Sequence, residues 1–278
     1  MGGLSTCHIC TRATGGSFFH LSGGPYLGGV EAERAKRGTI TEFSRGARHR
    51  MMTSLAVIDR QKAGLPSMFT LTYPDEMPIW PIRESKVKRD LRVFRRRFVR
   101  KYGKKAVLWR RENQIRKSGV HKGEPGPHVH GLAWDVEPGA EGLRWISENW
   151  YEVVGSGEEK HRRAGTNWFQ PESWRGVLAY VSKYFAKVED VQVKGRSWGY
   201  WHRELLPVKL ISEEIPVESF HPVRRVLRAY IARQTGRKPR VRDRWSGLSA
   251  FLSERTGENL VAWARDIARW KGTGGVGG

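Results

Sequence analysis

Two closely spaced histidines are the first feature of this sequence that could do chemistry. His128 and His130 lie in a segment, residues 128–135, that is predicted to be a β-strand. Side chains alternate between the two faces of a strand, so both imidazoles would project from one face while Val129 points into the core. Neighbouring imidazoles suit a divalent metal ion. The alternative is a fortuitous pair of histidines on a strand face.

A carboxylate on the preceding strand could complete such a site. Residues 106–114 are predicted to be a strand, and their connection to 128–135 lacks apolar periodicity, which favours a long hairpin and antiparallel pairing. Glu112 could then reach the face of the histidines and give a set of two imidazoles and one carboxylate. Glu124, in the connecting turn, is the second candidate. The other interpretation of Glu112 is an ion pair with an arginine (Arg110, Arg111 or Arg116).

A predicted helix near residues 172–188 carries two tyrosines. At about 3.6 residues per turn, one face of this helix holds Tyr180, Lys183, Tyr184 and Lys187, and the opposite face is apolar (Leu178, Val181, Phe185 and Val188). A phenol is a poor nucleophile at neutral pH because its pKa is about 10. A nearby cation and a metal-polarised electrophile make it useful. The alternative is that both rings only pack at a helix boundary.

These segments follow one another in an informative order. A strand of alternating apolar residues and threonines, Phe69-Thr70-Leu71-Thr72-Tyr73, precedes the carboxylate strand, the histidine strand and the tyrosine helix. In this order the chain resembles the HUH endonuclease superfamily, specifically the replication initiator (Rep) proteins of rolling-circle replication. Since a lysine lies between its two tyrosines, it is most similar to the two-tyrosine initiators of small single-stranded DNA phages and some plasmids. The resemblance covers about residues 69–187.

The resemblance implies a fold and a mechanism. The fold would be α+β, with a ferredoxin- or RRM-like antiparallel sheet, helices on one face and the metal site on the sheet. His128, His130 and Glu112 would hold Mg²⁺ or Mn²⁺, with manganese favoured by the two imidazoles. Tyr180 would nick single-stranded DNA, leaving a 5′-phosphotyrosine and a free 3′-hydroxyl, and Tyr184 would make the second cleavage.

Further roles and partners come with the same resemblance. Lys183 would lie beside the attacking phenol, and Lys187 would contact DNA. The substrate would be single-stranded DNA or an origin hairpin, and a host helicase and a host polymerase would be the protein partners. The expected location is the cytoplasm of a bacterial host, with no membrane partner, because the chain has neither a long apolar stretch nor a secretory signal.

Two other classes of function fit parts of the pattern. A transposase or a conjugative relaxase uses the same chemistry, but relaxases tend to have three histidines in the metal motif, and single-strand transposases have one tyrosine and shorter chains. A non-catalytic RNA- or DNA-binding protein would use basic helices to bind the backbone and aromatic rings to stack on bases.

The charge of the chain is consistent with a polyanionic partner. The sequence holds 50 Lys and Arg against 28 Asp and Glu, a net charge of +22. Much of this excess lies in residues 83–102 and 221–245, where a solvated helix face is the alternative to phosphate contact. The predicted DNA-binding residues of these blocks are all arginines (Arg92, Arg95, Arg96, Arg97, Arg100, Arg224, Arg225 and Arg228).

Composition along the chain predicts three parts. Residues 1–38 are expected to be a flexible Gly-rich leader, in which Cys7 and Cys10 are either two solvated thiols or the start of a zinc site. Residues 39–210 would form the endonuclease domain. Residues 211–278 would form a basic helical accessory module. Strands interleaved irregularly with helices favour an α+β fold over a parallel, doubly wound one.

Overall fold

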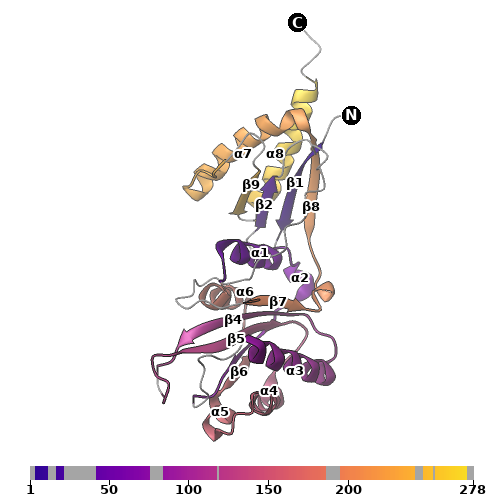
Figure 1. Cartoon of the computed structure of the whole chain (residues 1–278). Coiled ribbons are helices and arrows are strands. Elements are labelled where there is room, and N and C mark those ends of the chain that lie inside the picture. The colour runs from indigo at the N-terminus through magenta and orange to yellow at the C-terminus, as the bar shows by residue number, and fades with distance from the viewer. Residues whose placement is uncertain are drawn as a thin grey trace, which may run out of the picture. The chain divides into compact units, whose positions relative to one another are not determined.

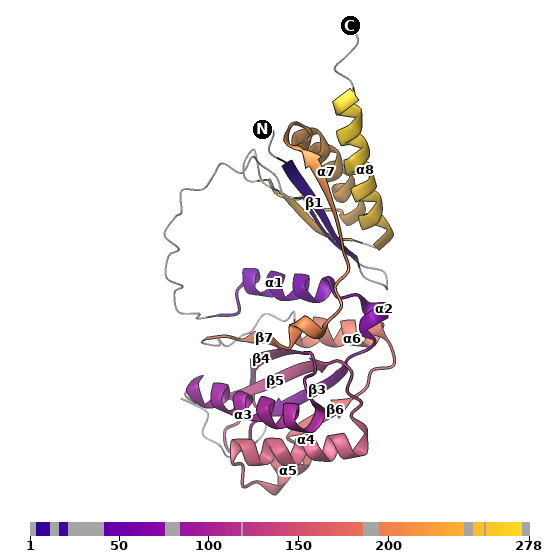
Figure 2. The same cartoon turned by 90° about the vertical axis from the view of Figure 1, so that its right-hand side faces the viewer.

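The structure is a computed structural model that describes residues 4–11, 17–21, 42–75, 84–117, 119–185, 195–241, 247–252 and 254–273. The chain divides into two compact units. The five-stranded unit comprises Arg37–Met52 and Lys62–Pro207, and the four-stranded unit comprises Met1–Lys36, Thr53–Gln61 and Val208–Gly278 (Figures 1 and 2). No helix in the described ranges has both the length and the apolar character to cross a membrane.

The five-stranded unit is built on one antiparallel sheet with the strand order β6-β3-β5-β4-β7. Its strands are β3 (Ser67–Thr72), β4 (Val107–Ile115), β5 (Pro125–Ala133), β6 (Thr166–Phe169) and β7 (Trp198–Trp201). The predicted antiparallel hairpin is confirmed as β4 and β5, and the α+β class is confirmed. Because β5 is the middle strand, both histidines stand at the centre of the sheet.

Two helices, α3 (Glu84–Tyr102) and α4 (Gly139–Val154), cover one face of this sheet (Figure 2). On α3 the apolar residues recur every three or four positions, which gives the helix one apolar face. Those side chains pack with α4 in an aromatic-rich core, where the rings of Phe94 and Trp150 meet edge to face with centroids 5.7 Å apart. This core packs against one face of the sheet, and the candidate site lies on the other face.

Helix α6 (Trp174–Tyr180) lies over the opposite face and continues as a π-helix, Val181–Phe185 (Figures 1 and 2). The expectation of helices on one face only is therefore wrong. The sheet has an apolar row on each side, because Leu108 and Leu132 lie on the histidine face and are also fully buried. The π-helix matters because such turns are rare and are frequent at functional sites.

The remaining helical segments of the described chain are short, apart from α1, which crosses the boundary between the two units in the sequence. They are α1 (Arg45–Ala56), α2 (Arg60–Ala63), α5 (Glu159–Ala164) and the 3₁₀ turns Arg203–Leu205 and Val217–Ser219.

The four-stranded unit has its own antiparallel sheet, in the order β8-β1-β2-β9. Its strands are β1 (Leu4–Thr11), β2 (Ser17–Leu21), β8 (Leu210–Pro216) and β9 (Leu248–Leu252). Helices α7 (Phe220–Thr235) and α8 (Glu254–Thr273) pack on this sheet around a separate core. Residues 4–11 and 17–21, which were expected to belong to a flexible leader, form strands, and the expected helical module contributes two strands as well as two helices. Strands from both ends of the chain pair with each other, so no local pattern reveals them.

Gly131, directly after His130, is required by the packing of the sheet. It pairs with Phe69 on β3, and a Cβ atom at this position would lie 2.0 Å from Cζ of the Phe69 ring. That ring is fully buried and is held edge-on by Phe94 and Trp168, with centroids 6.3 and 6.5 Å away. It has no free space into which it could move, so only glycine fits here.

We therefore expect Gly131→Ala to lower the free energy of unfolding by about 3 kcal/mol through overpacking. Urea unfolding followed by tryptophan fluorescence would measure it. The matched control is Gly176→Ala on α6, where an added Cβ makes only an ordinary 3.7 Å contact and helix propensity favours alanine by up to about 1 kcal/mol. Similar losses in the two variants would contradict this explanation.

Candidate functional site

The register of the sheet brings the predicted residues to one face. On the β4–β5 ladder, Glu112 is paired with His128 and Arg110 with His130. Since partners in register share a face and side chains alternate along each strand, all four point to the same side. The prediction that Glu112 reaches the face of the histidines is confirmed. Strand β3 adds two hydroxyls to that face, Thr72 opposite His128 and Thr70 opposite His130.

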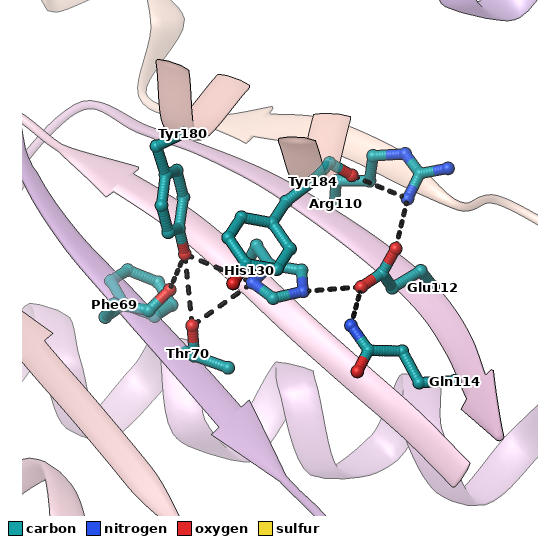
Figure 3. A network of polar contacts seen from close by, with 8 residues as sticks. All are labelled: Phe69, Thr70, Arg110, Glu112, Gln114, His130, Tyr180 and Tyr184. Carbon is teal, nitrogen blue, oxygen red and sulfur yellow. Dashed lines mark hydrogen bonds and ion pairs between the residues drawn. The ribbon is translucent and has the colours of Figure 1, made fainter. Parts of the chain in front are cut away.

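His130 lies at the centre of a hydrogen-bond network (Figure 3). Its Nε2 atom is 2.9 Å from Oε1 of Glu112, and its Nδ1 atom is 3.1 Å from both the Tyr180 hydroxyl and Oγ1 of Thr70. An ionised carboxylate only accepts, so Nε2 carries the proton and donates to Glu112. In the neutral ring Nδ1 then accepts. This chain of phenol, imidazole and carboxylate is the geometry in which an imidazole can take a proton from a nucleophile.

Tyr180 is held tightly in this network. Its hydroxyl donates to the backbone oxygen of Phe69 at 3.0 Å and lies 3.1 Å from Oγ1 of Thr70. The side chain is buried, and this burial raises the pKa of the phenol well above its usual value, while the hydrogen bond with Thr70 opposes the rise only in part. A phenol has one proton to donate, so a Tyr180 that bonds to Phe69 is not ready to give that proton to His130.

Tyr184 occupies a more accessible place on the same helix. Its ring stacks on the imidazole of His130 with centroids 4.3 Å apart and an interplanar angle of 25°, and it lies 4.7 Å from the Tyr180 ring. The ammonium of Lys183 lies 4.8 Å from the ring centroid, and a hydrogen bond between Lys183 and Tyr184 raises the pKa of the lysine. The cation therefore lies beside Tyr184.

Arg110 connects the histidine strands to the tyrosine helix, a role that the sequence analysis missed. Its guanidinium is fully buried, lies 3.5 Å from Oε2 of Glu112 and donates to the backbone oxygen of Tyr184 at 3.0 Å. The ring of Phe43 covers it at 4.3 Å. The sequence suggested only an ion pair of Glu112 with Arg110, Arg111 or Arg116, although the spacing of Arg110 and Glu112 on one strand puts both on the same face.

The protonation states of the donor set suit a divalent metal ion. Burial lowers the pKa of both His128 and His130, so both imidazoles are neutral at pH 7. Burial alone raises the pKa of Glu112, but the hydrogen bonds from His130 and Gln114 and the charge of Arg110 outweigh it and keep the carboxylate ionised. Neutral imidazoles and carboxylates are the forms that bind metals.

The present geometry is not that of a finished metal site. Within the described ranges, no three Cys, His, Asp or Glu side chains are arranged to hold an ion. His130 instead faces Glu112 directly, and the rings of His128 and His130 are 6.3 Å apart. The types of donor fit Mg²⁺ or Mn²⁺, and the His130–Glu112 hydrogen bond is the contact that would open. Glu124, the alternative ligand, lies in the β4–β5 turn and pairs with His121 at 3.1 Å.

The predicted DNA-binding arginines fall into two separate places. Five lie on α3, which covers the face of the sheet opposite to the histidines, and α4 neutralises part of that helix through the ion pair of Arg97 with Glu152 at 2.5 Å. The α3 block therefore does not lead directly to the histidine face. Arg224, Arg225 and Arg228 lie on α7 in the other unit. Lys187 lies outside the described residues.

Comparison with known proteins gives no further assignment, since no family model, no curated protein and no solved structure matches this chain. The candidate site therefore stands on its geometry alone.

The titration of His128 makes the stability of the metal-free protein depend on pH. Burial and the neighbouring His130 lower its pKa to about 4, against about 6.5 in the unfolded chain. Between these values the unfolded state binds the extra proton, so stability falls as pH decreases from about 6.5 to 4. Urea unfolding in EDTA would measure the free energy of unfolding at pH 7.5 and at pH 4.5. The decrease between these two pH values should be larger by about 2 to 3 kcal/mol in the wild type than in His128→Asn. Equal losses would show that His128 titrates normally.

Proposed function

We propose that this chain is a replication initiator that nicks single-stranded DNA with a tyrosine and transfers the strand, as in rolling-circle replication. The main support is the position of the tyrosine helix. The Tyr180 hydroxyl lies 3.1 Å from Nδ1 of His130, and the Tyr184 ring stacks on the same imidazole. Two phenols, two histidines and a carboxylate from distant parts of the chain thus share one sheet face. A purely structural role does not require that set of groups.

The chemistry would be a transesterification. A phenol oxygen attacks the phosphorus of one phosphodiester, an O–P bond to tyrosine forms and the bond from phosphorus to the 3′ oxygen breaks. The phenol proton is released, and the leaving 3′ oxygen takes up a proton to become a hydroxyl. A divalent ion held by His128, His130 and Glu112 would polarise the phosphate. Because the phosphodiester is kept as a covalent link to tyrosine, closing the strand again needs no ATP.

The contacts favour Tyr184 as the first nucleophile, although the family resemblance had suggested Tyr180. Lys183 lies against Tyr184, whereas burial raises the pKa of Tyr180 and its proton is directed to Phe69. Tyr180 would then act second, after the first adduct has displaced the local hydrogen bonds. Its hydroxyl already lies 3.1 Å from Nδ1 of His130, one of the proposed metal ligands.

The test is a covalent adduct with a defined polarity. The protein would be incubated with Mn²⁺ and single-stranded oligonucleotides that tile its own replicon, and then separated on a denaturing gel. A label at the 3′ end of the oligonucleotide should stay with the protein, and a label at the 5′ end should leave on a shorter strand with a 3′-hydroxyl. If the folded, metal-loaded protein forms no adduct with any fragment, the proposal is wrong.

A further inference from the structure

A basic hollow lies on the four-stranded unit, whereas the histidine and tyrosine residues belong to the five-stranded unit. It has a volume of about 490 Å³ and is lined by one face of α7 and by the segment that follows it (His221, Arg224, Arg225, Arg228, Ala229, Lys238 and Val241). Both elements belong to the same compact unit as the core beneath them. The hollow therefore depends on no placement of one unit against the other.

The shape of the hollow is fixed by the end of α7. Gly236 takes a left-handed conformation with φ 66°, which glycine adopts without strain, and the chain turns back along the helix. Nε of Arg228 donates to the backbone oxygen of Pro239 at 2.8 Å and holds the returning segment in place. That bond uses one of the five N–H donors of the guanidinium. Lys238 is thereby brought beside the arginines of α7.

The described residues around the hollow carry charge of one sign. Residues 220–241 include seven Arg or Lys and neither Asp nor Glu, and no carboxylate is among the lining residues in the described ranges. Arg224 is packed over the Phe220 ring, 5.1 Å from its centroid, so part of this charge is held in place rather than dispersed. Like charges gathered this closely repel each other unless an anion lies between them. The hollow is thus suited to phosphate groups.

The lining favours the backbone of a duplex over a single strand. Proteins that bind single strands stack bases on aromatic rings, and no Phe, Tyr or Trp is among the described residues that line this hollow. Arginine guanidinium groups and a lysine ammonium bind phosphate oxygens instead, and such contacts position a duplex without reading its sequence. The volume is that of a site for a ligand larger than one free phosphate ion.

We infer that the four-stranded unit is a second DNA-binding module, whose hollow holds the phosphate backbone of a double-stranded segment such as the stem of an origin hairpin. This inference rests on the proposed function only for the identity of the DNA. The module would anchor the duplex while the histidine and tyrosine face acts on a single-stranded portion.

The test compares two double variants of the full chain. Arg225→Ala/Lys238→Ala removes two exposed cations of the lining, and Arg233→Ala/Arg240→Ala removes two exposed cations of the same segment outside it. Fluorescence anisotropy with a labelled duplex would measure affinity over a range of salt concentrations. The first variant should bind the duplex at least about tenfold more weakly and lower the salt slope by about two. The second should lose less than about threefold, and circular dichroism should show both folded.

The controls separate the possible failures. Equal losses in the two variants would mean that the charge acts diffusely, which overturns the assignment to the hollow. Equal weakening of duplex and single strand by the first variant would overturn the preference for a duplex. Adduct formation by the wild type is measured in parallel. If the wild type forms the adduct but the Arg225→Ala/Lys238→Ala variant binds the duplex as tightly as the wild type, only this inference is wrong. If that variant binds the duplex more weakly but the wild type forms no adduct, only the proposed nicking is wrong.

Discussion

Tyr184→Phe is expected to reduce the rate of the first covalent adduct by at least about 10³-fold, because it removes the nucleophile itself. Tyr180→Phe should leave that first adduct within about tenfold of the wild type, since its hydroxyl is buried and donates to Phe69 in the resting structure. The same variant should fail to close the strand into a circle, because that step needs a second phenol. Single-turnover kinetics with protein in excess over a 3′-labelled oligonucleotide would measure the first step.

The control for this pair is Tyr151→Phe, a tyrosine of α4 on the other side of the sheet from the site, whose ring stacks against His161. It should react like the wild type. The opposite order, with Tyr180→Phe inactive and Tyr184→Phe active, would show that Tyr180 attacks first and that the contact of Lys183 with Tyr184 does not select the nucleophile. Equal residual rates would show that the two phenols alternate freely.

His130→Ala is expected to abolish the adduct, again by at least about 10³-fold. The substitution removes one proposed metal ligand and leaves two buried groups, the Glu112 carboxylate and the Tyr180 hydroxyl, without their shared partner. EDTA should stop the reaction of the wild type, and added Mn²⁺ should restore it, but Mn²⁺ should not rescue the variant. His121→Ala, a histidine of the β4–β5 turn, is the matched control. Circular dichroism would establish that His130→Ala is folded.

Metal removal also separates two roles of His130. If the wild type still forms the adduct in EDTA while His130→Ala does not, the metal proposal is wrong, and the His130 imidazole, on which the Tyr184 ring stacks, supports the reaction without a metal ion. If His130→Ala reacts normally with metal present, His130 has neither role, and the proposed site is wrong.

Much of the local structure could be predicted because it follows from short-range periodicity. The alternation of Thr70 and Thr72 with buried apolar residues predicted β3, and on α3 the apolar residues recur at the three- or four-residue spacing of a helix. The same period of two placed His128 and His130 on one face of a strand. The position of Glu112 on that face needed the observed register, in which it pairs with His128, because a slip of one residue would turn its side chain to the other face.

Other features depend on partners that are distant in sequence. Strands β1 and β2 pair with β8 and β9, and a Gly-rich N-terminal segment shows no sign of partners more than 190 residues away. The burial of Arg110 under Phe43 depends on the same kind of long-range packing. The position of the α3 arginines could not be predicted either. The sequence of a helix shows which of its faces is apolar, but not which face of the sheet it will cover.

The sequence by itself therefore determined the chemistry available to this protein: two imidazoles, a carboxylate, two phenols and a large positive charge. The tertiary structure decided how these groups are used. It placed Lys183 against Tyr184, buried Tyr180 beside His130, and moved one basic block to the far side of the sheet. The physical reason is that side-chain types and periodicities are local properties, whereas burial, pKa and ion pairing depend on neighbours that only the folded chain brings together.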